Sequence, residues 1–132
     1  MPSLSLPRAR LLRHDLEFQA VYRARMKKAG GGVALFTMPN GRSYHRLGLA
    51  VAKRGGTAIA RNRVKRLVRE AWRLEQHGFC GGQTASEPPR CYDMVVSATA
   101  SAAETLTLDG VRCALRELVA LSDRAWVKRG SP

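Results

Sequence analysis

Residues 55–73 constrain the fold more than any other stretch of the chain. Six of the thirteen residues from Arg61 to Arg73 are basic, and apolar residues recur between them at the i, i+3, i+4, i+7 spacing of a helix. The apolar positions are Ala60, Val64, Leu67, Val68 and Ala71. This pattern predicts a long helix with one side buried against a core.

The other side of this helix is predicted to be cationic. It carries Asn62, Lys65, Arg66, Arg69 and Arg73, with Arg61 and Arg63 on its flanks. A charge run is ordinarily a solvated face on which opposite charges pair four residues apart. Here only Glu70 interrupts the positive charge, and Lys65 repels Arg69. We therefore expect the face to bind a polyanion, and the planar fork of arginine favours phosphate.

The overall charge supports the same kind of partner. The 132 residues suffice for one domain with a proper core, and 23 Lys and Arg against 10 Asp and Glu give a formal net charge of +13. Such an excess indicates nucleic acid or an anionic membrane surface. The membrane is the weaker alternative, because no apolar run approaches the roughly 20 residues of a spanning helix.

The cysteines and the N-terminus bear on the compartment. Cys80, Cys91 and Cys113 fit neither a disulfide framework nor the spacing of a zinc site, which indicates reduced thiols in a cytoplasmic protein. Residues 1–13 are predicted to be an extended basic arm that is too polar for a signal peptide. The N-terminal segment contains serine and arginine and lacks acidic residues, so an organelle transit segment stays open as an alternative.

A short helix is expected near the start of the chain. Asp15 is its predicted N-cap, and the helix should run over Leu16–Arg25. Phe18, Val21 and Tyr22 fall on one face of it at i, i+3 and i+4, a spacing whose ordinary meaning is packing into the core.

A hairpin is expected next. The glycine run Gly30–Gly32 leads into a predicted strand over Val33–Met38. Asn40–Gly41 is a strong hairpin signal, because both residues tolerate positive φ, and its partner strand is expected over Tyr44–Lys53.

Side chains alternate in size along this second strand. Leu47, Leu49 and Val51 should face the core, and Gly48, Ala50 and Ala52 should face the other way. A face of small residues lets a helix or a ligand backbone approach closely. After the strand, Gly55–Gly56 should form a turn, and Thr57 is the predicted N-cap of the basic helix.

One more strand and one more helix are predicted after the basic helix. A long loop is expected over Gly78–Arg90. Tyr92–Ala98 contains an apolar run typical of a strand covered on both faces, and its place after a strand and a helix puts it in the same sheet. Thr107 should cap a last helix that runs to about Lys128. Its predicted inward residues are Val111, Leu115, Leu118, Val119 and Trp126.

The sequence offers no constellation for catalysis by the protein itself. Its ten acidic residues are scattered, whereas a two-metal nuclease needs several convergent carboxylates. His14, His45 and His77 lack ligand spacing, and no nucleophile motif is recognisable. The chain is therefore typical of a nucleic-acid binder, with a stand-alone endonuclease as a remote alternative.

At Ala60–Glu70 the sequence closely resembles the RNR signature of the bacterial ribonuclease P protein subunit family. The resemblance continues in Arg10–Leu11, Glu17–Tyr22, Leu47–Lys53, Tyr92–Val96 and Leu106–Thr107. It implies an α/β fold, a two-layer α+β sandwich in which one mixed sheet of about four strands packs with three helices in the order αβββαβα. It also implies a left-handed crossover around the basic helix, against the usual handedness.

The resemblance implies an accessory protein for a catalytic RNA that removes the 5′ leader of precursor tRNA. It implies that the protein broadens the substrate range and lowers the magnesium demand, while Mg²⁺ is held mainly by the RNA and the substrate and none by the protein alone. The RNA-binding residues would be Lys53, Arg54, Arg61, Asn62, Arg63, Lys65, Arg66, Arg69 and Arg73. The leader-binding cleft would comprise Phe18, Tyr22, Phe36, Asn62 and Lys65.

The expected partners are thus the catalytic RNA and precursor tRNA in the cytoplasm, with no membrane and no obligatory protein partner. A ribosomal-type RNA-binding protein without a role in cleavage is the alternative of a different class.

Overall fold

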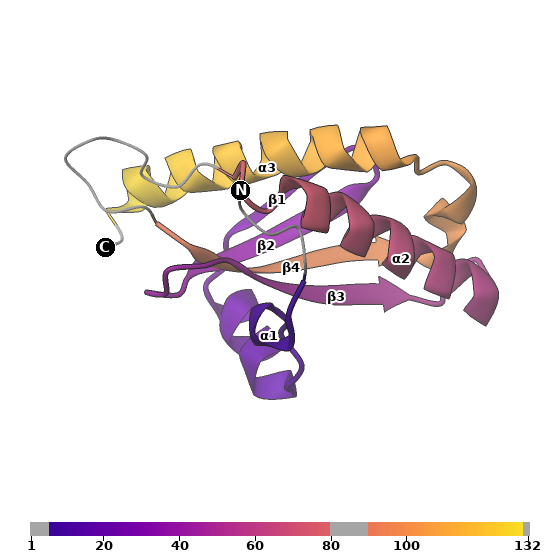
Figure 1. The fold of residues 1–132 in the computed structure, drawn as a ribbon, viewed down its shortest axis with the longest axis horizontal. Helices are drawn as coiled ribbons and strands as arrows, with labels where there is room; N and C mark the ends of the chain where they lie inside the picture. Colours follow the sequence, from indigo (N-terminus) through magenta and orange to yellow (C-terminus); the bar gives the residue numbers. More distant parts are fainter. Residues whose placement is uncertain (1–5, 80–89, 131–132) are drawn as a thin grey trace.

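The structure is a computed structural model that describes residues 6–79 and 90–130. Its helices and strands follow the predicted αβββαβα order (Figure 1). They are α1 (Asp15–Arg23), β1 (Lys27–Gly30), β2 (Val33–Pro39), β3 (Arg46–Ala52), α2 (Ala58–Glu75), β4 (Tyr92–Thr99) and α3 (Leu108–Arg129). Short 3-10 turns lie at Arg8–Arg10 and Ala100–Glu104. Most of the loop predicted over residues 78–90 lies outside the described residues.

The strand order β1-β2-β4-β3 corrects the predicted hairpin. Asn40–Gly41 does connect β2 to β3, but β4 lies between these strands, antiparallel to β2 and parallel to β3. A turn signal fixes a change of chain direction and leaves open which strand pairs with which. The hairpin is formed instead by β1 and β2, through Gly31 and Gly32 with φ of 62° and 85°. The order implied by the resemblance includes this strand, but the residue pattern did not assign it, because Lys27–Gly30 is a polar edge strand without apolar alternation.

Helices cover both faces of the sheet unequally. α2 and α3 pack on one face around the larger core, and α1 lies alone on the other face (Figure 1). Leu47 and Val51 of β3 point into the larger core, as their alternation predicts, and Gly48 points toward α1. The small-residue face of β3 thus admits a helix, as expected.

The basic helix forms as its periodicity predicts. Thr57 is its N-cap, and the hydroxyl oxygen accepts the N–H of Ala60 at 3.1 Å. Val64, Val68 and Ala71 are fully buried in the larger core. Burying apolar surface contributes about 25 cal/mol per Å² removed from water. The apolar side of α2 therefore faces the core.

An ionic cluster joins α2 to α3. The Glu75 carboxylate is buried on α2 and accepts from Arg112 at 2.7 Å and from Arg116 at 3.0 Å. Burial raises its pKa, but these hydrogen bonds and charges outweigh burial, so the pKa of Glu75 lies below its ordinary value. The cluster fixes how the two helices lie against each other.

α1 starts one residue earlier than predicted. Its N-cap is His14, and Asp15 is the first helical residue, which corrects the predicted cap. The Glu17 carboxylate accepts the N–H groups of Arg13 and His14 at 3.0 and 3.1 Å. A side chain in the first turn therefore reaches back to the N–H groups just ahead of the helix, as the Glu of a capping box does.

The last strand and helix match their predictions. β4 is buried at Tyr92–Val96, and Thr107 caps α3 by accepting the N–H of Gly110 at 3.1 Å. All the predicted inward residues of α3 are buried, and the Trp126 indole donates to the Thr37 hydroxyl at 2.9 Å. The left-handed crossover of β3, α2 and β4 stays a prediction.

Candidate RNA-binding site

The cationic face of α2 is open to solvent. Arg63, Arg66 and Arg69 are exposed and Lys65 is half-buried. In the part of the chain that the structure describes, these four side chains form no ion pair or side-chain hydrogen bond. Their mutual repulsion is therefore not offset from within the protein, which favours an external anion.

Two of the predicted cations have partners in the protein. Arg61 Nε donates to the carbonyl of Val51 at 2.6 Å, which ties the start of α2 to the end of β3. Arg73 forms a two-point pair with Glu70, with bonds of 2.9 and 2.6 Å. Arg61 has a structural role in addition to its charge, and Arg73 contributes less positive field than the sequence indicates.

A groove of about 290 Å³ joins the cationic face to α1. Phe18, Lys65 and Arg69 line it together. Arg13, Leu11, Leu12, Leu47 and Leu49 complete its lining. The groove brings together an aromatic ring and two cations without ion pairs in the described structure, and Phe18 and Lys65 both belong to the predicted cleft. It adds Arg13, which was not among the predicted site residues.

The other predicted cleft aromatics form a separate pair. Tyr22 of α1 and Phe36 of β2 meet edge to face with centroids 4.9 Å apart. Lys27 of β1 is the cross-strand neighbour of Phe36 and places its ammonium 5.6 Å from the ring centroid. Lys27 was not among the predicted site residues, because the residue pattern did not assign a strand to Lys27–Gly30. The glycine pair that follows β1 was the available signal.

The remaining predicted residues lie at the start of α2. Asn62 lines a concavity of about 240 Å³ with Ile59, Arg63 and Arg66, and does not line the Phe18 groove. Lys53 and Arg54 are exposed in the turn that precedes the helix. The residues predicted to bind the leader thus lie in three places: the Phe18 groove, the Tyr22–Phe36 pair and the concavity at Asn62.

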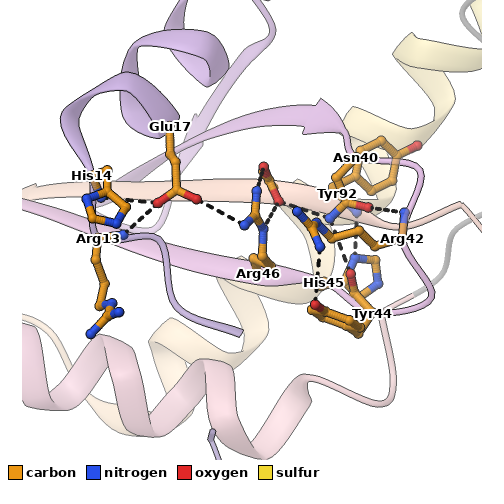
Figure 2. A network of polar contacts seen from close by, with 10 residues as sticks. Arg13, His14, Glu17, Asn40, Arg42, Tyr44, His45, Arg46 and Tyr92 are labelled. Atoms are coloured by element: carbon orange, nitrogen blue, oxygen red, sulfur yellow. Dashed lines mark hydrogen bonds and ion pairs between the residues drawn. The ribbon is translucent and has the colours of Figure 1, made fainter. Parts of the chain in front are cut away.

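An ion-pair network sets the position of α1 on the sheet (Figure 2). Arg46 at the start of β3 binds both oxygens of Asp93 at 2.7 and 2.6 Å and Glu17 of α1 at 3.0 Å. The N–H groups at the start of α1, that of Arg13 foremost, and the Arg46 charge hold the pKa of Glu17 below its ordinary value despite partial burial. Glu17 is ionised at neutral pH and anchors the helix that carries Phe18.

The described residues contain no group of three His, Cys, Asp or Glu side chains gathered to hold a metal ion. Among the helices in those same ranges, none is long and apolar enough to cross a membrane.

A helix with a solvent-exposed cationic face beside a groove lined by an aromatic ring, on an α+β fold, defines a nucleic-acid-binding protein. The sequence model of the Ribonuclease P family matches residues 6–121. The chain belongs to the ribonuclease P protein family, and the alternative of a ribosomal-type protein is not favoured.

Individual relatives agree with this membership. The ribonuclease P protein component of Natranaerobius thermophilus is 32% identical over 114 residues, which cover 86% of this chain and 88% of that protein. The same component of Clostridioides difficile is 39% identical over 67 residues, or 51% of this chain and 59% of that protein. The RNase P protein from Thermotoga maritima is 27% identical and superimposes with a TM-score of 0.65, covering 82% of this chain and 93% of that one.

Proposed function

We propose that this chain, as the accessory subunit of ribonuclease P, holds the 5′ leader of precursor tRNA in the Phe18 groove while α2 contacts the catalytic RNA. The observation that carries the proposal is the groove itself, which Phe18, Lys65 and Arg69 line together. Hydrolysis stays with the RNA, and this chain contributes binding and orientation.

The groove has the chemistry that single-stranded RNA requires. Aromatic side chains stack bases for roughly 1–3 kcal/mol each, and neighbouring cations follow the backbone. Lys65, Arg69 and Arg13 supply positive charge along one groove. Such contacts are largely independent of sequence, which suits leaders that differ among precursor tRNAs.

The magnesium ions of the reaction belong, in this proposal, to the RNA and the substrate. Described carboxylates near the site are already bound to arginine: Glu17 and Asp93 to Arg46, and Glu70 to Arg73. Cations of the protein that neutralise phosphate reduce the need for other counterions. We therefore expect this chain to lower the magnesium concentration at which the substrate binds.

The test is cleavage of precursor tRNA by a bacterial ribonuclease P RNA at low magnesium, with the protein, without it, and with the protein alone. Stimulation only when both are present supports the proposal. Binding of the RNA with unchanged cleavage would instead support a purely structural RNA-binding protein. Cleavage by the protein alone would revive the endonuclease alternative.

A further inference from the structure

α1 is a short helix with little burial of its own. It spans nine residues, of which only Val21 is buried, and it packs on the sheet face opposite α2 and α3 (Figure 1). Contacts at its two ends therefore decide how it lies on the sheet. At the first turn, the Glu17 carboxylate binds Arg46 of β3 at 3.0 Å. The last turn carries Tyr22 and is anchored from a distant part of the chain.

That anchor is Arg129, the last residue of α3, which binds the connection between α1 and β1. Its Nη1 donates to the carbonyl of Ala24 at 2.7 Å, and its Nη2 donates to the carbonyl of Arg25 at 3.3 Å. These carbonyls lie at the C-terminal end of α1, where a positive charge is favourable. Arg25 has a φ of 55°, in the left-handed region that residues with a side chain rarely adopt. The second bond thus holds a turn that the local sequence does not favour.

Trp126 orients Arg129. The guanidinium carbon of Arg129 lies 4.6 Å from the centroid of the Trp126 ring. Stacking on an aromatic ring orients a guanidinium and leaves its N–H groups free to donate. The same indole donates to the hydroxyl of Thr37 at 2.9 Å, and Thr37 follows Phe36 in β2. The last turn of α3 is therefore bonded to β2 beside Phe36 and to the chain just after Tyr22.

These bonds control the spacing of two rings, Tyr22 and Phe36. The rings meet edge to face with centroids 4.9 Å apart, and Tyr22 is 38% exposed. The ammonium of Lys27 lies 5.6 Å from the centroid of Phe36. An exposed ring pair beside a cation suits an unpaired base and its phosphate. Phe36 is fixed in a strand with neighbours on both sides, whereas Tyr22 moves with α1.

We propose that Arg129 is a positioning residue for the leader, which holds the end of α1 and so keeps Tyr22 against Phe36. This inference rests on the proposed function and on the predicted place of both rings in the leader cleft. Arg129 acts through the α1–β1 connection rather than by touching the RNA. The helix α3, which carries none of the predicted site residues, thereby contributes to leader binding.

The experiment uses the holoenzyme formed with a bacterial ribonuclease P RNA and measures binding of precursor tRNA and of the same tRNA without its leader. Arg129→Ala should weaken precursor binding about fivefold, the scale of one net hydrogen bond, and leave the leaderless tRNA unchanged. In cleavage kinetics KM should rise while kcat stays the same. Arg124→Ala is the matched control, because it removes the same charge from α3, where Arg124 donates to Ala120 of its own helix at 3.5 Å.

A double-mutant cycle separates positioning from direct contact. In the Tyr22→Leu background the ring that Arg129 positions is absent, so adding Arg129→Ala should weaken precursor binding little further. An undiminished loss in this background would overturn the inference, since Arg129 would then bind the RNA itself. Equal precursor binding by Arg129→Ala and Arg124→Ala would overturn it too, as would an equal loss for the leaderless tRNA.

Failure of the proposed function gives a different result. If adding the wild-type protein to the catalytic RNA gave no preference for the precursor over the leaderless tRNA, the leader site itself would be absent. A normal preference in wild type, with Arg129→Ala indistinguishable from Arg124→Ala, would remove only the role of Arg129.

Discussion

The ring of Phe18 lies directly against the backbone of Gly48, at the place where any other residue would carry its side chain. A Cβ at position 48 would lie 2.8 Å from Cε2 and Cζ of Phe18 and 3.2 Å from Cβ of Leu12. The groove that holds Phe18 beside Lys65 therefore depends on a glycine in the middle of β3.

Gly48→Ala should displace Phe18 and weaken the leader contact. We expect a loss of about 1–3 kcal/mol in the free energy of unfolding, as for other overpacked sites, and a higher KM for precursor tRNA. Urea unfolding and cleavage kinetics measure the two effects. Gly30→Ala is the control, because its Cβ would meet Leu118 at an ordinary 3.7 Å. Equal behaviour of the two variants would show that the close approach at Gly48 is unimportant.

Arg46→Met should destabilise the fold strongly. Asp93, whose side chain is only 3% exposed, would lose both bonds from Arg46, and Glu17 would lose its tie to β3. Leaving a buried charge unpaired costs about 3–5 kcal/mol, measurable by denaturant unfolding. Adding Asp93→Asn should recover part of this loss, since the unpaired charge is then gone. If the free energy of unfolding of Arg46→Met alone lies within roughly 1 kcal/mol of the wild-type value, the network contributes no more than an exposed ion pair does.

His45 should make the fold less stable in mild acid. Its imidazole is buried, and Nδ1 accepts the N–H of Tyr92 at 3.0 Å. Burial, together with the charge of Arg10, lowers the pKa of His45 from 6.5 to about 4, while Asp123 opposes the shift. Because protonation favours the unfolded chain, this contribution is complete above pH 6.5 and is lost as the pH falls toward 4.

The variant His45→Asn isolates this contribution. The asparagine oxygen can still accept the N–H of Tyr92 but does not titrate in this range. The loss in the free energy of unfolding between pH 7 and pH 4 should be smaller in the variant than in wild type, by a margin on the order of 2–3 kcal/mol. Parallel curves for the two proteins would contradict the buried state of His45.

Arg69→Ala and Arg73→Ala should differ in their effect on RNA binding. Arg69 lines the groove without an ion pair in the described structure, whereas Arg73 is paired with Glu70. Loss of Arg69 should lower the salt slope by up to about one unit. Loss of Arg73 should lower it by less, because Arg73 is already bound to Glu70 and neutralises less phosphate charge. Salt titrations of catalytic RNA and precursor tRNA binding measure both. Equal slopes for the two variants would indicate that the pair with Glu70 opens on binding.

Local rules predicted the helices and the caps of the two longer ones well. Val64 and Val68 are buried in α2, and Thr57 and Thr107 cap their helices as expected. These features depend on residues within one or two turns of each other, so a single sequence contains the information. The cap of α1 is the exception, where Glu17 reaches back to the N–H groups ahead of Asp15.

Strand pairing was predicted less well, for a physical reason. Alternation correctly placed Leu47 and Gly48 on opposite faces of β3, because side-chain direction is a local property. Hydrogen-bonded neighbours are not local: β4, from Tyr92 onward, inserts between β2 and β3 across a long stretch of sequence. The Asn40 turn signal therefore led to the wrong partner.

The sequence by itself determined that this chain has a cationic helix in which only Glu70 interrupts the positive charge, a strand with one small-residue face, and the signature of the ribonuclease P protein family. The tertiary structure alone decided which of those residues meet. Phe18 shares a groove with Lys65 because Gly48 admits α1, and Tyr22 pairs with Phe36 outside that groove. The reason is that such contacts join elements far apart in the chain, and their geometry follows from sheet order and close packing rather than from any local pattern.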